Sequence, residues 1–111
     1  MYNFVLFIMD NTAIKEIIDF LKKTLIENGL SVNFIAIFGS AMRGEMKNYS
    51  DLDLIIVSED FFGKDVFERA KMMMKAEIAT QRKFGIPMDI LNMSPEEYYG
   101  PRLIESEIFE G

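Results

Sequence analysis

Two aspartates at the start of an apolar run are the residues best suited to chemistry in this sequence. They lie in FGSAMRGEMKNYSDLDLIIV, residues 38–57, where one leucine separates Asp51 from Asp53. Side chains alternate along a strand, so both carboxylates would point to one face and repel each other unless a cation lies between them. Oxygen ligands of this kind suit Mg²⁺ or Mn²⁺. For the pair alone, a solvated strand start is an equally open interpretation.

A third acid, Asp89, lies inside the apolar segment IPMDILNM, residues 86–93. An unpaired carboxylate in a central strand is costly to bury. If this strand lies beside the strand of Asp51 and Asp53, the three acids can form one cluster. Two divalent ions held by such a cluster can activate an attacking oxygen and stabilise a phosphoryl-transfer transition state.

The Gly39-Ser40 pair leaves a predicted strand and enters a helical turn. Free backbone N–H groups at such a turn suit a phosphate, although for a lone Gly-Ser pair an ordinary strand-to-helix turn is the favoured interpretation. A P-loop is excluded, because Glu45 and Met46 stand where Lys and Ser or Thr are needed. The segment also has too few glycines for a dinucleotide-binding fingerprint.

Composition narrows the chemistry further. The 111-residue chain has no Cys and no His, which excludes disulfides, thiolate nucleophiles, imidazole bases and the usual zinc sites. Its 18 acidic and 12 basic residues give a net charge of −6, which disfavours binding to nucleic-acid phosphates. The apolar run at residues 4–9 is too short for a signal peptide or a membrane span, so we expect a cytoplasmic protein.

Local patterns predict the elements that position these residues. N-cap candidates at residues 10–12 precede an amphipathic helix that ends near Gly29. The short β-branched or aromatic segments 31–38, 51–57 and 86–93 are predicted strands, and a short helix is expected after Gly39. This order predicts a single α/β domain over residues 1–111, with a mixed sheet of about three to four strands flanked by helices.

A long helix is predicted over residues 64–84, ended by Gly85. Its Met-rich segment KMMMKAE could suit an adaptable partner surface, but Met73 and Met74 fall near the apolar stripe, which favours core packing. A final helix is predicted to begin at the Ser94 N-cap and to be interrupted by Pro101. In the long helix predicted over residues 64–84, the apolar stripe contains Phe67, Ala70, Met74 and Ile78.

Together these residues resemble the minimal nucleotidyltransferase family of the DNA polymerase β-like superfamily. The family signature is Gly-Ser, ten residues, then Asp-x-Asp, which corresponds here to Gly39-Ser40, residues 41–50 and Asp51-Leu52-Asp53. The resemblance covers residues 12 to about 100. Further positions that match the family's GSxxRGE and SDLDL wording are Arg43, Gly44, Glu45 and Ser50.

The resemblance implies a role for each motif residue. Ser40 and the backbone at Gly39 would hold the β- and γ-phosphates of a nucleoside triphosphate. Asp51 and Asp53 would bridge two Mg²⁺ ions. Asp89 would bind the catalytic metal and help to deprotonate the acceptor hydroxyl.

Arg43 could steady a phosphate, although an exposed helix arginine is an equally open interpretation. Its place in the candidate site rests on the resemblance.

The family resemblance also implies a partner. Such enzymes can transfer AMP from ATP to a tyrosine of a helical HEPN toxin, so this chain would be the antitoxin of a type VII-like toxin–antitoxin pair and could form a hetero-oligomer with the toxin. We expect no additional acceptor-selecting domain, so the acceptor should be small or should be a docking protein. Two alternatives stay open: an antitoxin that neutralises by binding alone, and an enzyme for aminoglycoside-type small molecules, which the acidic surface would suit.

Overall fold

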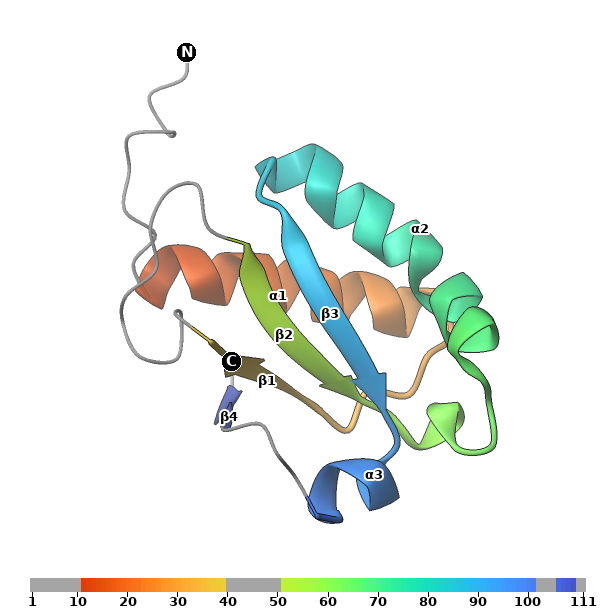
Figure 1. The fold of residues 1–111 in the computed structure, drawn as a ribbon. Helices are drawn as coiled ribbons and strands as arrows, with labels where there is room; N and C mark the ends of the chain where they lie inside the picture. Colours follow the sequence, from red (N-terminus) through yellow and green to blue (C-terminus); the bar gives the residue numbers. More distant parts are fainter. Residues whose placement is uncertain (1–10, 40–50, 102–105, 110–111) are drawn as a thin grey trace.

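The computed structural model describes residues 11–39, 51–101 and 106–109, which form a four-stranded sheet with helices on its faces (Figure 1). The strand order is β3-β2-β1-β4, with β2 and β3 parallel and β1 antiparallel to both β2 and β4. Among these residues, no helix combines the length and apolarity needed to cross a membrane. In chain order the elements are α1 (Asn11–Glu27), β1 (Phe34–Phe38), β2 (Leu52–Val57), the 3₁₀ helix η2 (Glu59–Phe61), α2 (Val66–Phe84), β3 (Met88–Met93), α3 (Pro95–Tyr99) and β4 (Ser106–Phe109).

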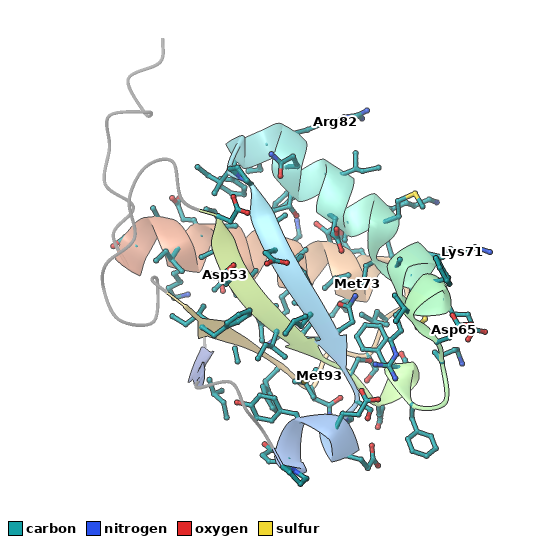
Figure 2. All side chains as sticks on the ribbon, in the orientation of Figure 1. Asp53, Asp65, Lys71, Met73, Arg82 and Met93 are labelled. Carbon is teal, nitrogen blue, oxygen red and sulfur yellow. The ribbon has the colours of Figure 1, made fainter. Side chains whose placement is uncertain are left out.

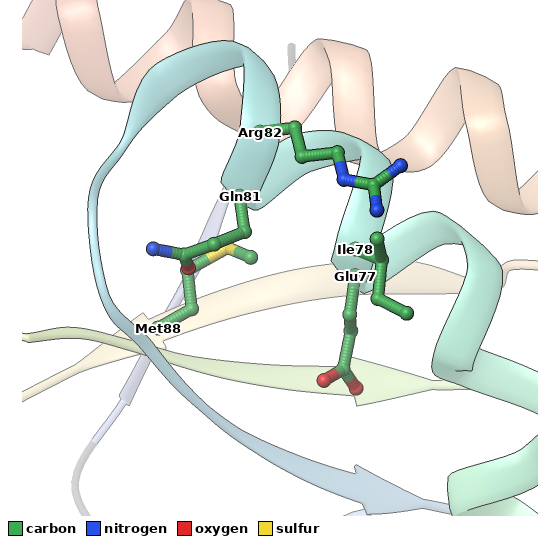
Figure 3. Close-up of a pocket in the computed structure, with 5 residues that line it drawn as sticks. All are labelled: Glu77, Ile78, Gln81, Arg82 and Met88. Atoms are coloured by element: carbon green, nitrogen blue, oxygen red, sulfur yellow. The ribbon is translucent and has the colours of Figure 1, made fainter.

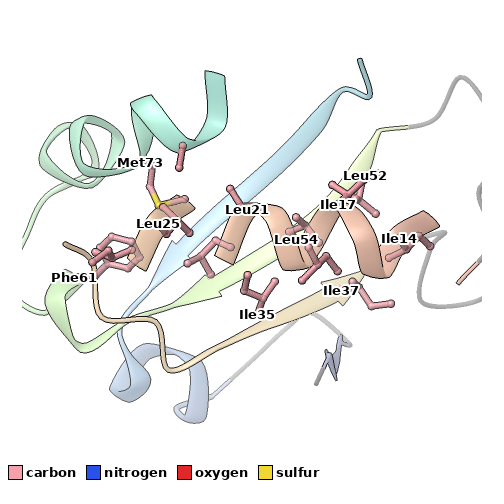
Figure 4. Close-up of a cluster of buried hydrophobic side chains, with 14 residues drawn as sticks. Ile14, Ile17, Leu21, Leu25, Ile35, Ile37, Leu52, Leu54, Phe61 and Met73 are labelled. Carbon is pink, nitrogen blue, oxygen red and sulfur yellow. The ribbon is translucent and has the colours of Figure 1, made fainter. Parts of the chain in front are cut away.

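The larger part of the hydrophobic core lies between the sheet and the two long helices, α1 and α2 (Figure 4). Leu52, Leu54 and Ile56 point from β2 into this core and are fully buried. Their alternation with Asp53 and Ile55 leaves the acid on the opposite face, as the sequence predicts. Other members of this cluster are Ile14, Ile17, Ile18, Leu21, Leu25, Ile35, Ile37, Phe61 and Met73.

A smaller cluster packs on the other face of the sheet, beneath α3. Ile55 and Val57 are fully buried there against Tyr98, whose ring meets Phe34 edge to face at 5.0 Å between centroids. The helix that supplies Tyr98 begins as predicted, with Ser94 as its N-cap and a proline in its first turn. This face therefore has an apolar end covered by α3, whereas the acids lie nearer the opposite end of β2 and β3.

The limits of α2 follow from its end residues. Asp65 accepts a hydrogen bond of 2.8 Å from the Glu68 backbone N–H, and Glu68 accepts one of 2.8 Å from the Asp65 N–H, so two free donors are satisfied at the N-terminus. Gly85 takes a left-handed conformation, with φ 69°, and ends the helix as predicted.

The predicted apolar stripe of α2 does not face the core, and this part of the prediction is wrong. Phe67, Met74 and Ile78 are 79%, 51% and 44% exposed, and Ala70 is exposed as well. The core side instead carries Met73, Ala76 and Thr80, where the Thr80 hydroxyl donates 2.7 Å to the Ala76 carbonyl and so can be buried. Both faces of α2 are apolar, and periodicity alone does not show which one packs on α1.

The C-terminal segment also departs from expectation. No prediction assigned a strand after Pro101, yet Ser106–Phe109 forms β4 and pairs antiparallel with β1. This strand forms because the edge of β1 offers backbone hydrogen-bonding groups for it to pair with. The short SEIF segment by itself gives no sign of that edge. The fourth strand completes the predicted mixed α/β sheet. The short helix expected after Gly39 lies outside the described residues.

Arg69 ties α2 to the end of β3 and to α3. Its guanidinium donates to the Asn92 carbonyl at 2.8 Å and to both Glu97 carboxylate oxygens at 2.8 and 3.0 Å, and its Nε donates to the Lys64 carbonyl at 3.0 Å. The hydrogen bonds from Arg69 lower the pKa of Glu97, against the smaller opposing effect of burial. One side chain thus holds three segments together.

We expect Arg69→Ala to reduce the free energy of unfolding by about 1–3 kcal/mol, since two carbonyls and a carboxylate lose their donor. Because the pKa of Glu97 is lower when folded, the pair stabilises the protein above the ordinary glutamate pKa and loses that effect as the pH falls below it. Glu97→Gln should keep the N-terminal cap of α3 but remove the loss of stability that the pair causes at acidic pH. Urea unfolding from pH 3 to 7 measures both effects, with Glu96→Gln as the control. An unchanged pH profile in Glu97→Gln would contradict this role of the pair.

Candidate active site

Asp53 and Asp89 face each other across two neighbouring strands. The strands β2 and β3 are parallel, and their register pairs Asp53 directly with Asp89. The third strand therefore lies beside the second, which was the condition for the three acids to come together. Figure 2 shows Asp53 in the half of β2 nearer its start. Alternation along β3 places Asp89 on the same face as Asp53, away from α1 and α2.

Asp51 directly precedes β2 and is exposed, as is Asp89, whereas Asp53 is partly buried. Burial raises the pKa of Asp53, and the negative charges of Asp89 and Asp51 raise it further. The other two predicted acids therefore both act on the carboxylate of Asp53. A positive charge at this point would relieve the repulsion and favour the ionised form of Asp53.

The donor atoms available here are carboxylate oxygens, which are the ligands that Mg²⁺ prefers. As the side chains stand, the described residues contain no group of three or more Asp, Glu, His or Cys side chains that could hold a metal ion. The charges of Asp51 and Asp89 therefore act on Asp53, but the three side chains do not converge on a common metal position. Their chemistry and charge fit a hard divalent cation.

Gly39 lies at the end of β1 and packs against the Asp53 carboxylate. Its φ of 72° is in the left-handed region, and a Cβ added to it would collide with the carboxylate oxygen and lie 3.3 Å from the Asp53 Cγ. The register explains this closeness, because the preceding Phe38 pairs with Asp53 across β1 and β2. Gly39 therefore keeps space for the acid, a role that the sequence did not reveal; only the strand register exposes it.

Two of the predicted site residues, Ser40 and Arg43, lie outside the described residues. Their roles in binding phosphate stay predictions, as does the phosphate contact of the Gly39 backbone. The described part of the site is therefore formed by Gly39 just after β1, Asp51 just before β2, Asp53 from β2 and Asp89 from β3.

Known proteins resemble this chain in sequence and in fold. Residues 14–111 match the sequence model of the nucleotidyltransferase domain. A crystal structure of a Sulfolobus solfataricus protein, provisionally described as a nucleotidyltransferase, is similar to this chain with a TM-score of 0.61 and 21% identity, over 90% of this chain and 87% of that one. At this identity the likeness shows the fold alone. No curated protein sequence matches the chain significantly.

Proposed function

Because the chain belongs to the nucleotidyltransferase domain family, we propose that it transfers AMP from ATP to a hydroxyl group of a partner protein, with Mg²⁺ as cofactor. The observation that carries this proposal is the pairing of Asp53 with Asp89 on one face of the sheet, with a raised pKa at Asp53. Carboxylates that repel one another in the free protein suit a reaction in which cations and phosphates enter together.

In the proposed reaction, an acceptor oxygen attacks the α-phosphorus of ATP. The new oxygen–phosphorus bond replaces the bond from the α-phosphorus to the oxygen bridging to the β-phosphate, and pyrophosphate leaves. Mg²⁺ held by Asp51, Asp53 and Asp89 would neutralise phosphate charge. Asp89, exposed on the edge strand β3, would take the proton of the acceptor hydroxyl.

The remaining residues would bind the nucleotide. The Gly39 backbone N–H and the Ser40 side chain would hold the β- and γ-phosphates, and Arg43 would pair with a phosphate oxygen. Gly39 also leaves room for Asp53, as described above. ATP is a cytoplasmic substrate, and we place the reaction in that compartment.

We propose a protein acceptor, in particular a tyrosine of a helical HEPN toxin, which would make this chain its antitoxin. The net charge of −6 disfavours a nucleic-acid acceptor, and the Gly-Ser and Asp-x-Asp spacing resembles that of minimal nucleotidyltransferases with such partners. Two outcomes would replace this proposal. One is that the chain neutralises the toxin by binding alone, and the other is that it transfers AMP to an aminoglycoside.

The acceptor can be identified by incubating the chain with Mg²⁺, ATP and one acceptor at a time. The acceptors are the protein encoded beside this chain's gene, bulk tRNA and an aminoglycoside panel. We expect mass spectrometry to find AMP on a tyrosine of the protein. AMP on tRNA or on a drug, with the protein unmodified, would contradict the proposal. Tight binding of the protein without AMP would favour the alternative of an antitoxin that acts by binding alone.

Nucleotide binding should also be measurable without turnover. At a hundredfold excess over its dissociation constant, Mg²⁺ with ATP should stabilise the chain by about 2–3 kcal/mol. We expect Asp89→Ala to lose most of this effect because one carboxylate ligand is gone. Asp19→Ala, which removes an exposed acid paired with Lys15 on α1, is the control. Thermal melting with and without Mg²⁺-ATP measures the difference, and equal stabilisation of both variants would remove Asp89 from the site.

A further inference from the structure

The outward face of α2 carries a continuous apolar ridge. It consists of Phe67, Ala70, Met74 and Ile78, which recur at helical spacing and are all exposed. We call these four residues the α2 ridge. Its members stand in four successive turns, with the small Ala70 between Phe67 and Met74. The core side of the same helix is already occupied by α1 and the sheet. A row of large apolar side chains on a solvent face is typical of an interaction surface.

A basic row borders the α2 ridge along one side. Lys71, Lys75 and Arg82 follow one another at helical spacing and are all exposed. Figure 2 shows Lys71 and Arg82 extending away from the body of the protein. Three cations on one helix face are a local exception in a chain whose net charge is −6. Such a border would favour a partner that carries negative charge beside its apolar stripe.

The α2 ridge ends at a pocket of about 350 Å³, formed where α2 meets the start of β3 (Figure 3). Ile78 of the ridge and Arg82 of the basic row both line it, together with Glu77, Gln81 and Met88. This hollow offers a place for one anchoring side chain at the end of the ridge. Met88 directly precedes Asp89 on the edge strand β3, so a partner seated here lies beside the edge of the candidate site.

We propose that the α2 ridge docks an amphipathic helix of the protein acceptor, whose apolar stripe is bordered by aspartates or glutamates opposite Lys71, Lys75 and Arg82. The proposal rests on the proposed function in assigning this helix to the acceptor. The ridge and the acids lie on opposite faces of the sheet, so docking leaves the candidate site open. The acceptor hydroxyl would reach Asp89 around the β3 edge.

A second copy of this chain fits the α2 ridge less well. In a symmetric antiparallel pair of α2 helices, the two basic rows would lie on the same side and face each other. In a symmetric parallel pair, the three cations of the basic row would face the other border of the ridge, where Glu77 supplies a single acid. Charge complementarity therefore favours a different, acidic helix over self-association.

Two synthetic helical peptides of about 18 residues, roughly five turns, test the proposal. Both carry the same leucine stripe, bordered by glutamates in one and by lysines in the other. Fluorescence anisotropy at low salt should show that the glutamate peptide binds at least about tenfold more tightly than the lysine peptide. Equal binding of both peptides, or no binding of either, would overturn the proposal.

Variants locate the binding surface. We expect two double variants, Phe67→Ser with Met74→Ser and Lys71→Glu with Lys75→Glu, each to weaken binding of the glutamate peptide by about tenfold or more. Ile26→Ser and Lys23→Glu make matched changes at exposed positions on α1 and should leave binding unchanged. Unchanged binding in the ridge variants would place the peptide elsewhere. A wild-type dimer that becomes monomeric in Phe67→Ser would instead identify a second copy as the occupant.

The link to the acceptor has its own test. Ridge variants should keep the stabilisation by Mg²⁺-ATP but label the protein encoded by the neighbouring gene at least about tenfold more slowly. Labelling at the wild-type rate would overturn the assignment of the docked helix to the acceptor. Absence of Mg²⁺-ATP stabilisation in the wild type would overturn the proposed function, and the peptide measurements would still decide the docking surface.

Discussion

Asp53→Asn should abolish nucleotide transfer, with a rate at least about a thousandfold below that of the wild type, because a neutral amide cannot replace a carboxylate metal ligand. The fold should survive the substitution. Burial and the charges of Asp89 and Asp51 raise the pKa of Asp53, so the folded state is penalised for ionising it. That penalty grows as the pH rises through the raised pKa, and the variant should therefore equal or exceed the wild type in stability at neutral pH without metal.

Thermal melting in EDTA and an ATP transfer assay measure the two effects separately. Asp19→Asn provides a matched change of charge at an exposed site on α1 and should alter neither. A melting temperature many degrees lower in Asp53→Asn would show that the carboxylate is structural. Full transfer activity would remove it from the site.

Gly39→Ala should impair both stability and activity. The left-handed conformation at φ 72° disfavours a side chain, and the new methyl group would meet the Asp53 carboxylate. We expect the free energy of unfolding to fall by about 2–4 kcal/mol, from backbone strain and overpacking together. Nucleotide transfer should fall by at least about a hundredfold, since a displacement of the acid by a fraction of an ångström misplaces the reacting groups.

Gly63→Ala separates these two causes. Gly63 has a nearly identical φ of 75°, but an added Cβ would meet nothing within 4 Å. It should therefore cost only the strain of the left-handed backbone, about 1–2 kcal/mol, and leave transfer unchanged. Urea unfolding and the transfer assay on both variants make the comparison. Equal losses in the two variants would show that the contact with Asp53 has no consequence.

The sequence was sufficient for the parts of the site that depend on alternation along a strand. Leu52 and Leu54 had to enter the core, which put Asp53 on the other face. The single acid in the third strand could join it only if that strand lay beside the second, which the sequence left as a condition. The exact pairing of Asp53 with Asp89 depends on the register of β2 and β3. That register is set by packing across the whole sheet and is not encoded in either segment alone.

The sequence was insufficient where one local pattern is compatible with two packing arrangements. The α2 helix has apolar residues on two faces, and contact with α1 selects the face of Met73 and Ala76 over that of Met74 and Ile78. Similarly, β4 forms because β1 has an edge available for pairing, although its segment lacks a strong strand pattern. Gly39 was recognised as part of a motif, but its contact with Asp53 arises only when β1 and β2 are paired.

The most direct test of nucleotidyl transfer uses ATP labelled at different phosphates. The chain, Mg²⁺ and the protein encoded by the neighbouring gene are incubated with α-labelled ATP or with γ-labelled ATP, and both the protein and the released pyrophosphate are counted. We expect label from the α-position on the acceptor protein and label from the γ-position in pyrophosphate, with both signals absent in Asp53→Asn. Transfer of the γ-label to the protein, or α-labelling that persists in Asp53→Asn, would contradict the proposed reaction.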